Sequence, residues 1–496
     1  MAVAQRSGGE LHAAPPPSVQ DGVLHQVASD WVAERRAGRH EGMPAGTRRP
    51  SLSVMRRTFS DPLGLLLEHR RRYGPVFTIR HGPQAVVWAI SAAANHQMLV
   101  TEADAFSWRE GRFIDLWPLL GDGLLNIDGP FHDGVRKLLV PAFHHGQVAA
   151  VADVMVAEGV AAVERLTPGE PFDLYAWARR LALRIALRAL LGIERAGADE
   201  LALADAFERA LNFHGLAVPL QMIRGPGTPH ARVLRARAEL DRRLYDEIRD
   251  RRRRGDPGAG VLGLLLSCTD GHGAPLDEAI VRDQTTTLLF AGHDTTTATL
   301  TFLLYELARN PGPERAVRDE LATVLGNRDP AAGELDGRSL PVLERTLDET
   351  LRMYPPAWVG PRRSTRPVVI DGVALPEGIG VQYSSWATHH LEELYPSPER
   401  FDPDRFIAGG PVSKLPKGAY IPFGGGTRIC IGKRFGQYEL RALAAVLLRR
   451  LRLELAPGER LQVAVTPTLG PKGGLRFVAR ASAGASLSSV SRAAAS

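Results

Sequence analysis

One stretch, Asp277–Asn310, restricts the possible folds more than any other feature of this 496-residue chain. It has a helical pattern that proline ends only at Pro311, which predicts one helix of about 50 Å at about 1.5 Å per residue. Its most apolar part, Thr285–Ala308, has about the length of a membrane span, but a histidine, an aspartate and many threonines lie at its middle. We therefore expect a buried helix of a soluble protein.

The rest of the chain predicts a mainly α-helical fold with small β-sheets, an α+β class. Apolar residues recur at three- and four-residue spacing over most of Phe131–Ala308, as helices require. Short apolar runs at Val76–Arg80 and Ala85–Ala89 flank the turn HGP and predict a strand pair. Further short strands are expected near Val368–Ile370 and Gly380–Tyr383, before a final helix.

The two ends of the chain differ in composition from the part between them. Residues 1–50 carry three consecutive prolines, several glycines and many arginines, and residues 481–496 are small and polar. We expect a loosely ordered N-terminal extension (1–50), one large domain (51–480) and a flexible C-terminal tail (481–496). Residues 1–22 lack the apolar core of a signal peptide.

The net charge of +6 comes from scattered arginines. Their densest run, Arg249–Arg254, ends a helix-like stretch and is most simply a solvated helix end. We therefore expect no nucleic-acid binding. A basic patch that receives an acidic protein partner is the better explanation of the charge.

Cys430 is one of only two cysteines and lies in the glycine-rich stretch YIPFGGGTRICIG, Tyr420–Gly432. Two cysteines cannot build a disulfide framework or a four-cysteine zinc site, and their scarcity suggests a reducing compartment. Three interpretations of Cys430 compete: part of a phosphate-binding loop, a packed core thiol, or a metal-ligating thiolate.

The spacing excludes the phosphate-binding loop. That loop needs G-x-x-x-x-G-K-[ST], but five residues separate Gly426 from Gly432, and Arg434 stands where a hydroxyl is required. A packed thiol is the common fate of a free cysteine, yet it leaves the surrounding glycines and arginine unexplained.

A metal-ligating thiolate explains more of the pattern. A helical pattern starts almost at Cys430, so backbone N–H groups and the helix dipole would lower the pKa of the thiol. Bare glycine backbone suits the close approach of a flat cofactor, and Arg428 could bind that cofactor's carboxylates. Haem fits these requirements, because cysteine thiolate is one of its known ligands.

With these residues in place, the sequence resembles the cytochrome P450 family over about Pro62 to Phe477. FGGGTRICIG (Phe423–Gly432) matches the family's F-x-x-G-x-R-x-C-x-G haem loop at every fixed position. AGHDTT (Ala291–Thr296) is similar to the oxygen-activating helix motif. ETLR (Glu349–Arg352) resembles the family's E-x-x-R, and PERF (Pro398–Phe401) its arginine-bearing partner segment. The order of the motifs is also that of the family.

The resemblance implies a role for each matched residue. Cys430 would ligate the iron of haem b (iron protoporphyrin IX). GPFHDGVRKLLVPAF resembles a helix carrying H-x-x-x-R, whose two basic side chains lie one turn apart. For a further propionate contact, spacing favours Arg362 over Arg363. The residues expected to contact the haem or its propionates are Phe423, Gly424, Arg428, His132, Arg136, Arg362 and Ala291.

Asp294 and Thr295 are expected to relay protons to bound oxygen. Gly292, in mid-helix, costs about 1 kcal/mol relative to alanine, which a local opening of the helix over a ligand would explain. The two side chains would then face a pocket. The alternative is a threonine-rich core helix whose hydroxyls bond to the carbonyls four residues earlier.

Glu349, Arg352 and Arg400 are expected to form a buried ion cluster that holds the cysteine loop. Glu349 and Arg352 share a helix face at i, i+3, and the family places an arginine from the PERF segment beside them. Breaking such a cluster would cost about 3–5 kcal/mol.

The implied reaction is monooxygenation: one oxygen atom of O2 enters a lipophilic small molecule by hydroxylation or epoxidation. NAD(P)H would supply electrons through a ferredoxin and ferredoxin reductase or their equivalent, since no such module is fused. An acidic ferredoxin could dock near Lys433, Arg434 and Arg441. The expected apolar substrate pocket includes Phe113, Phe290, Trp358, Val359 and Leu469.

We accordingly expect a cytoplasmic, bacterial-type monomer of secondary metabolism, with no membrane span. Two alternatives are a haem-thiolate enzyme that uses peroxide or acts without net redox change, and a non-catalytic haem sensor. The intact Asp294–Thr295 pair argues against both.

Overall fold

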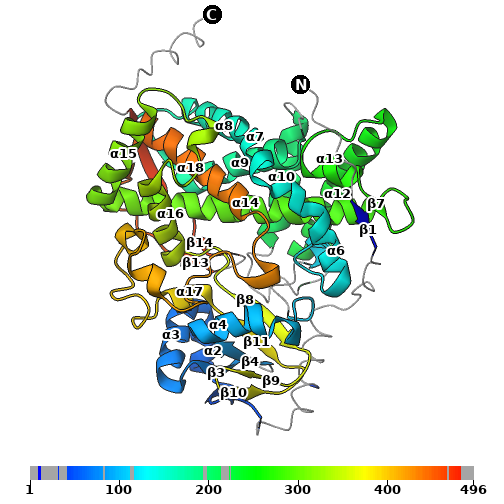
Figure 1. The fold of residues 1–496 in the computed structure, drawn as a ribbon, viewed down its shortest axis with the longest axis vertical. Coiled ribbons are helices and arrows are strands. Elements are labelled where there is room, and N and C mark those ends of the chain that lie inside the picture. Colours follow the sequence, from blue (N-terminus) through cyan, green and yellow to red (C-terminus); the bar gives the residue numbers. More distant parts are fainter. Residues whose placement is uncertain are drawn as a thin grey trace, which may run out of the picture.

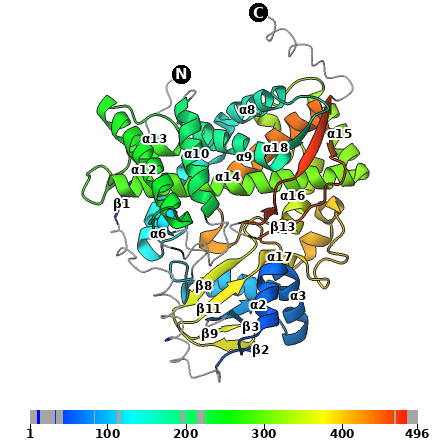
Figure 2. The same cartoon turned by 180° about the vertical axis from the view of Figure 1, so that it is seen from behind.

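The structure is a computed structural model that describes residues 9–12, 32, 42–81, 84–111, 117–193, 198–213, 223, 225–465 and 468–481. Helices fill one end of the molecule and the largest sheet occupies the other, with α14 crossing the helical part (Figures 1 and 2). This confirms the predicted class, mainly α with small β-sheets.

The predicted long helix is α14, Glu278–Arg309, which differs from the expected bounds by one residue at each end. The Asp277 side chain accepts from the Ala279 N–H and starts the helix, and the next helix begins at Pro311. Most of α14 is buried on all sides because other helices surround it.

The remaining helices are α2 (Leu52–Ser60), α3 (Pro62–Tyr73), α4 (Ala92–His96), α5 (Trp117–Leu120), α6 (Gly129–Leu139), α7 (His145–Ala150), α8 (Ala152–Glu164), α9 (Leu174–Ile185), α10 (Ala198–Asn212), α12 (Pro229–Arg254), α13 (Gly260–Leu266), α15 (Pro311–Leu325), α16 (Pro341–Met353), α17 (Ser385–His389) and α18 (Lys433–Arg450).

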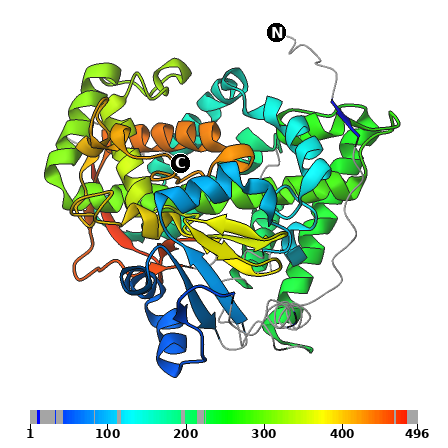
Figure 3. The same ribbon diagram turned by 60° about the horizontal axis from the view of Figure 1, so that its bottom comes forward.

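The largest sheet has the strand order β2-β3-β4-β11-β8-β5 and comes forward in Figure 3. Its strands are β2 (Gly46–Thr47), β3 (Val76–His81), β4 (Gln84–Ala89), β11 (Gly380–Tyr383), β8 (Gly360–Ser364) and β5 (Phe106–Ser107). β3 and β4 form the predicted antiparallel pair, with Val76 opposite Ala89, while β4 and β11 run parallel. β8 pairs antiparallel with β11, which places Arg362 opposite Val381 in the interior of the sheet.

Smaller sheets complete the fold. They are β12-β15-β6 (Leu451–Leu455, Arg476–Ala481, Pro171–Asp173), β9-β10 (Val368–Ile370, Val373–Leu375), β13-β14 (Val463–Ala464, Gly470–Pro471) and β1-β7 (Glu10–Leu11, Thr269–Asp270). Strands β9 and β11 have the bounds that the sequence predicted.

The predicted N-terminal extension contains a docked segment. β1 pairs parallel with β7, and the Leu11 side chain is buried in the main core. A Cβ on Gly134 of α6 would lie 2.7 Å from Leu11 Cδ1, so the contact is close. Glu10–Leu11 is therefore packed on the helices rather than loose; the domain bounds as a whole stay a prediction.

The arginine run at the end of α12 is largely occupied by local partners. Arg251 is buried and donates to Glu247 and to the Gly192 carbonyl oxygen, and Arg249 and Arg252 pair with Glu278. These contacts agree with a helix end rather than a nucleic-acid-binding patch.

Among the described residues, one stretch, His145–Glu164, is long and apolar enough to cross a membrane, and 39% of it is buried. It is divided between α7 and α8 in this fold. A core helix of a soluble protein has the same length and composition, so this is weak evidence for a span.

Glu439 is a buried acid at the contact between α14 and α18. It is 1% exposed, accepts one hydrogen bond from Thr296 Oγ1 (3.2 Å), and its Oε1 atom has no hydrogen-bond partner. Burial raises the pKa of Glu439 from 4.5 to about 8, and the Thr296 hydroxyl offsets only part of that rise. The side chain is therefore mostly protonated in the folded protein at neutral pH.

We expect Glu439→Gln to flatten the dependence of folding stability on pH. Between pH 4.5 and about 8 the unfolded chain releases the Glu439 proton and the folded chain retains it, so stability falls as pH rises through this window. At pH 7 this lowers the free energy of unfolding by on the order of 3 kcal/mol relative to its value below pH 4.5. Denaturant unfolding from pH 5 to 8 measures it, with the exposed Glu399→Gln as control. An unchanged slope in Glu439→Gln would contradict the assignment.

Candidate functional site

The cysteine loop joins a short 3-10 turn, Gly426–Arg428, to the start of α18 at Lys433. The Cys430 N–H donates to the Phe423 carbonyl oxygen (2.9 Å), which closes the loop. Gly424 and Gly426 have φ values of +70° and +60°, and a Cβ on Gly426 would lie 1.9 Å from the Leu99 carbonyl oxygen. The glycines thus permit a turn that other residues would obstruct.

The electrostatics of the thiol differ from the sequence expectation. Cys430 is accessible to solvent, yet protein surrounds the thiol closely enough that burial raises its pKa above the ordinary value. The N–H groups of Gly432 and Lys433 and the charge of Arg136 act in the opposite direction but are outweighed. The expected net lowering of the thiol pKa was therefore wrong for the protein alone, since burial outweighs the helix start.

The environment of Arg362 gives the strongest indication of what the site binds. It is 2% exposed, its Nη1 donates to the Pro361 carbonyl oxygen (2.7 Å), and its Nη2 has no hydrogen-bond partner. Its guanidinium lies 3.4 Å from the Trp108 ring centroid, and burial lowers its pKa to about 10. A buried cation without a carboxylate partner is costly, so an anion would stabilise this position. Arg363, by contrast, donates to backbone carbonyl oxygens of Glu110 and Gly378.

Three further basic side chains gather near Arg362. Arg428 pairs with Asp128 (2.6 Å) and also lies over the Trp108 ring, while Arg136 donates to the Ile429 carbonyl oxygen (2.6 Å). His132 is buried beside Asp133, and burial followed by the Arg428 charge lowers the pKa of its imidazole.

Haem fits this donor set. The arginine charges influence one another's pKa, and that of Arg136 also acts on Cys430, so the four basic groups and the thiol belong to one neighbourhood. Such a cluster is stabilised by a dianionic group, as the two propionates of haem provide. Asp128 and Trp108 are members that the sequence analysis missed, because no motif marks them.

α14 does not open at the AGHDTT motif. It is a continuous α-helix there, and Thr295 Oγ1 donates to the Ala291 carbonyl oxygen (2.8 Å), as in the alternative that the sequence left open. Ala291, Gly292 and Thr295 are partly exposed and share one helix face. Asp294 instead is 2% exposed, and its carboxylate accepts a hydrogen bond from the Thr468 hydroxyl. The expectation that both Asp294 and Thr295 face a pocket is therefore wrong for Asp294.

A polar cluster from α9, α10 and α14 adjoins Asp294. Glu208 accepts two hydrogen bonds from Arg179 (3.2 and 2.7 Å) and lies 3.1 Å from Nε2 of the fully buried His293. Burial lowers the pKa of Arg179, but the charges of Glu208 and then Asp294 outweigh it and raise that pKa above its usual value. Burial, followed by the Asp294 charge, raises the pKa of Tyr175. Sequence spacing gave no signal for Arg179 or Glu208, since they lie on separate helices.

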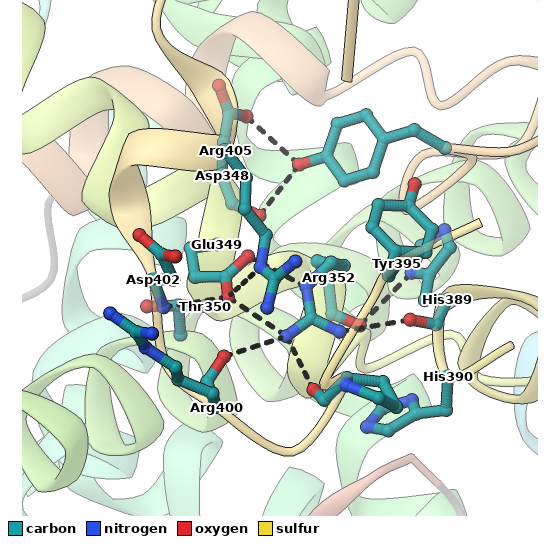
Figure 4. Close-up of polar contacts among 12 residues, drawn as sticks. Asp348, Glu349, Thr350, Arg352, His389, His390, Tyr395, Arg400, Asp402 and Arg405 are labelled. Carbon is teal, nitrogen blue, oxygen red and sulfur yellow. Dashed lines mark hydrogen bonds and ion pairs between the residues drawn. The ribbon is translucent and has the colours of Figure 1, made fainter. Parts of the chain in front are cut away.

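The ion cluster predicted around Glu349 is present (Figure 4). Arg352 donates to both Glu349 carboxylate oxygens (2.7 and 2.9 Å), and both side chains are fully buried. The remaining Arg352 donors reach the carbonyl oxygens of His389 and Pro398. The Asp402 N–H donates to Glu349, so the cluster ties α16 to the segment that precedes the cysteine loop.

The third arginine is Arg405 rather than Arg400. Arg405 Nε lies 3.4 Å from Glu349 Oε1, whereas the Arg400 side chain is exposed and only its carbonyl oxygen approaches Arg352, at 3.5 Å (Figure 4). The chain contains two similar segments, PERF (Pro398–Phe401) and PDRF (Pro403–Phe406), and the sequence analysis chose the first. The second segment forms a 3-10 turn that points its arginine at Glu349.

His389 connects this cluster to the cysteine loop. Its Nε2 accepts from the Ile421 N–H (3.0 Å), so Nδ1 carries the proton and donates to the Arg352 carbonyl oxygen (3.2 Å). Burial lowers the pKa of His389 well below its ordinary value, which keeps the ring neutral.

The structure places most of the expected pocket residues in cores. Phe290, Trp358 and Leu469 are buried, and the Trp358 indole N–H donates to the Val465 carbonyl oxygen (2.7 Å). Val359 is partly buried, and Phe113 lies outside the described residues. Their role as pocket residues stays a prediction.

Two of the three residues expected at a partner surface remain available. Arg434 is exposed and Lys433 partly exposed, whereas Arg441 is buried, donates to the Leu335 carbonyl oxygen and pairs with Glu344. Arg441 was therefore wrongly placed at that surface, because it lies about two helical turns beyond Arg434 on α18, where the segments of Leu335 and Glu344 cover it.

We expect Arg405→Ala to lower the free energy of unfolding by about 3 kcal/mol, since it leaves a buried carboxylate one cation short. Arg400→Ala is the matched control and should change it by less than about 0.5 kcal/mol, because only its backbone takes part. Denaturant unfolding of both variants gives the comparison. Equal losses, or the reverse order, would restore Arg400 as the third member.

The chain is similar to known proteins over most of its length. The family model described as Cytochrome P450 matches residues 54–472. The cyclooctat-9-en-7-ol 5-monooxygenase of Streptomyces melanosporofaciens is 33% identical over 394 residues, which cover 78% of this chain and 84% of that protein. The putative cytochrome P450 120 of Synechocystis sp. is 30% identical, with coverages of 82% and 90%.

Solved structures agree with these relatives. The retinoic acid-bound cyanobacterial CYP120A1 superposes with a TM-score of 0.78 at 29% identity, covering 89% of this chain and 99% of that one. The haem domain of cytochrome P450DA, at 24% identity, has the same fold with a TM-score of 0.80 over 89% of this chain and 98% of that one. The chain belongs to the cytochrome P450 family, and with it to the haem-dependent monooxygenases that use O2 and an external reductant.

Proposed function

We propose that this enzyme is a haem b monooxygenase in which Cys430 ligates the iron and Arg362, Arg428, Arg136 and His132 bind the propionates. The observation that carries the proposal is the buried Arg362, whose Nη2 has no hydrogen-bond partner, in the same cluster as an accessible cysteine thiol. An anionic, thiolate-ligated group satisfies both at once.

When bound, haem supplies the activation of O2. The protein's own groups set the conditions for it. The N–H groups of Gly432 and Lys433 act on Cys430 and favour its ionised form, and Phe423 fixes the loop through its carbonyl oxygen. Thr295 Oγ1 holds a proton on the partly exposed face of α14. The Asp294 carboxylate, held by Thr468, is one residue away and would exchange protons with it through water after a side-chain rotation.

The substrate that we propose is a largely hydrocarbon molecule of terpenoid type. The relatives' names include cyclooctat-9-en-7-ol and retinoic acid, an unsaturated alcohol and a polyene acid. The expected pocket residues are apolar, which suits such a molecule. Hydroxylation or epoxidation both fit. A screen of terpenoid alcohols and acids for a shift of the haem spectrum on binding tests this class against fatty acids.

Electrons are proposed to come from NAD(P)H through a ferredoxin and its reductase, or an equivalent pair. Exposed Arg434 and partly exposed Lys433 follow Cys430 directly and would attract an acidic carrier to that side of the molecule. Localisation in the cytoplasm, as a monomer, agrees with this supply of electrons.

We expect Arg362→Leu to separate haem binding from folding. The variant should lose roughly tenfold or more in haem affinity, while the haem-free protein should be as stable as wild type or more stable by up to about 3 kcal/mol, because an unpaired buried cation is removed. Haem titration and denaturant unfolding measure the two effects. Arg363→Leu is the matched control and should destabilise the haem-free protein, since it loses two backbone contacts. A Cys430→Ala variant that keeps the thiolate-type carbon monoxide spectrum would refute the ligand assignment.

His389 should influence the state of the haem ligand through Ile421. His389→Gln keeps an acceptor near the Nε2 position, so it should retain most of the thiolate-type carbon monoxide spectrum. His389→Asn keeps only the donor to the Arg352 carbonyl oxygen, so it should lose a large share of that spectrum. The spectrum of the reduced carbon monoxide complex measures that share. If Asn and Gln behave alike, the Ile421 hydrogen bond does not position the loop.

A further inference from the structure

Helix α2 exposes its apolar side chains to solvent. Leu52, Met55 and Phe59 are 80%, 42% and 70% exposed, and no other described helix shows three such residues so close together. At about 100° per residue they lie within an arc of about 60°, so they form one continuous stripe. An exposed stripe of this kind marks an interaction surface.

The opposite face of α2 already holds the helix on the protein. Val54 packs against a core cluster, and Arg57 pairs with Asp61 and with Glu68 of α3. Since these contacts anchor α2, the stripe of Leu52, Met55 and Phe59 is not needed for folding.

The charge around the stripe is net positive. Residues 42–60 contain four arginines and no acidic residue, and the carboxylates of Asp61 and Glu68 pair with Arg57 on the opposite face of α2. Arg56 is exposed and lies about 40° around the helix from Leu52, next to the stripe. Arg49 is also exposed and lies three residues before Leu52. Within the described part of the chain, neither Arg49 nor Arg56 forms an ion pair.

We propose that α2 docks this enzyme on an anionic lipid surface. Leu52, Met55 and Phe59 enter the acyl boundary, while Arg49 and Arg56 contact the phosphates of the headgroups. α2 lies at the sheet-containing end of the molecule, beside α3 (Figure 2).

A lipid surface fits better than a protein partner. A stable protein interface buries more than about 1,000 Å² in total, whereas the stripe consists of three side chains on a nine-residue helix. In a bilayer each apolar side chain contributes on its own, and each nearby arginine adds attraction to anionic lipid. The carboxylates that contact α2, those of Asp61 and Glu68, pair with Arg57, which reduces the repulsion that such a surface would impose.

The full-length, haem-loaded protein can be tested by co-sedimentation with vesicles. Wild type should bind vesicles of phosphatidylcholine and phosphatidylglycerol. Its affinity for vesicles of phosphatidylcholine alone should be lower, by about fivefold for each arginine that contacts anionic headgroups. Leu52→Ser and Phe59→Ser should each weaken binding about tenfold. Arg56→Glu should weaken it and reduce its salt dependence. Val369→Ser and Ile407→Ser remove apolar side chains that are 55% and 44% exposed elsewhere, and should change nothing.

Three results would overturn the proposal. The first is a wild type that does not bind anionic vesicles, and the second is a double variant, Leu52→Ser with Phe59→Ser, that binds as well as wild type. The third is a concentration-dependent dimer, seen without vesicles, that these two substitutions dissociate, which would make the stripe a contact between two copies of the chain. Circular dichroism and the haem spectrum of each variant establish that it is folded.

Discussion

The Glu349–Arg352 ion pair is the interaction on which the rest of the site depends. Both side chains are fully buried, so each would be very costly alone, and the attraction between them compensates only with additional hydrogen bonds. Those bonds come from the backbone of two segments, the end of α17 at His389 and the following stretch at Pro398 and Asp402. The pair therefore specifies how α16, the end of α17 and the segment before the cysteine loop must meet. From there His389 transmits the constraint to Ile421, nine residues before Cys430.

Local patterns carried enough information for the framework. The long helix α14 and strands β9 and β11 were predictable to within a residue, because helix breakers and short apolar runs define them without reference to the rest of the fold. The third arginine of the ion cluster was not, since PERF and PDRF offer nearly the same local chemistry. Only the path of the chain after Pro398, which turns Arg405 rather than Arg400 toward Glu349, decides between them.

Some features of the candidate site could likewise be predicted from the sequence, and others could not. Spacing favoured Arg362 over Arg363, and Arg362 is the one of the two whose Nη2 has no hydrogen-bond partner, although its role in the site stays a prediction. Helix geometry alone could not give the orientation of Asp294, because at about 100° per residue Asp294 lies only about 60° around the helix from Ala291. The partners of Asp294 could not be predicted either, because Thr468 and Arg179 come from distant segments brought together only by folding. The pKa of Cys430 also needed the structure, since burial competes with the helix start and no sequence pattern measures burial.

Two features of this molecule carry costs that folding alone does not repay: the unpaired cation at Arg362 and the apolar stripe of α2. A buried, half-satisfied guanidinium destabilises the haem-free chain, and exposed Leu52 and Phe59 favour aggregation. In our proposals each becomes favourable when a binding partner is supplied, an anionic cofactor for the first and an anionic lipid layer for the second. The same physical rule thus leads from both features to a binding partner, because local conflicts in an otherwise consistent fold concentrate where the protein binds something else.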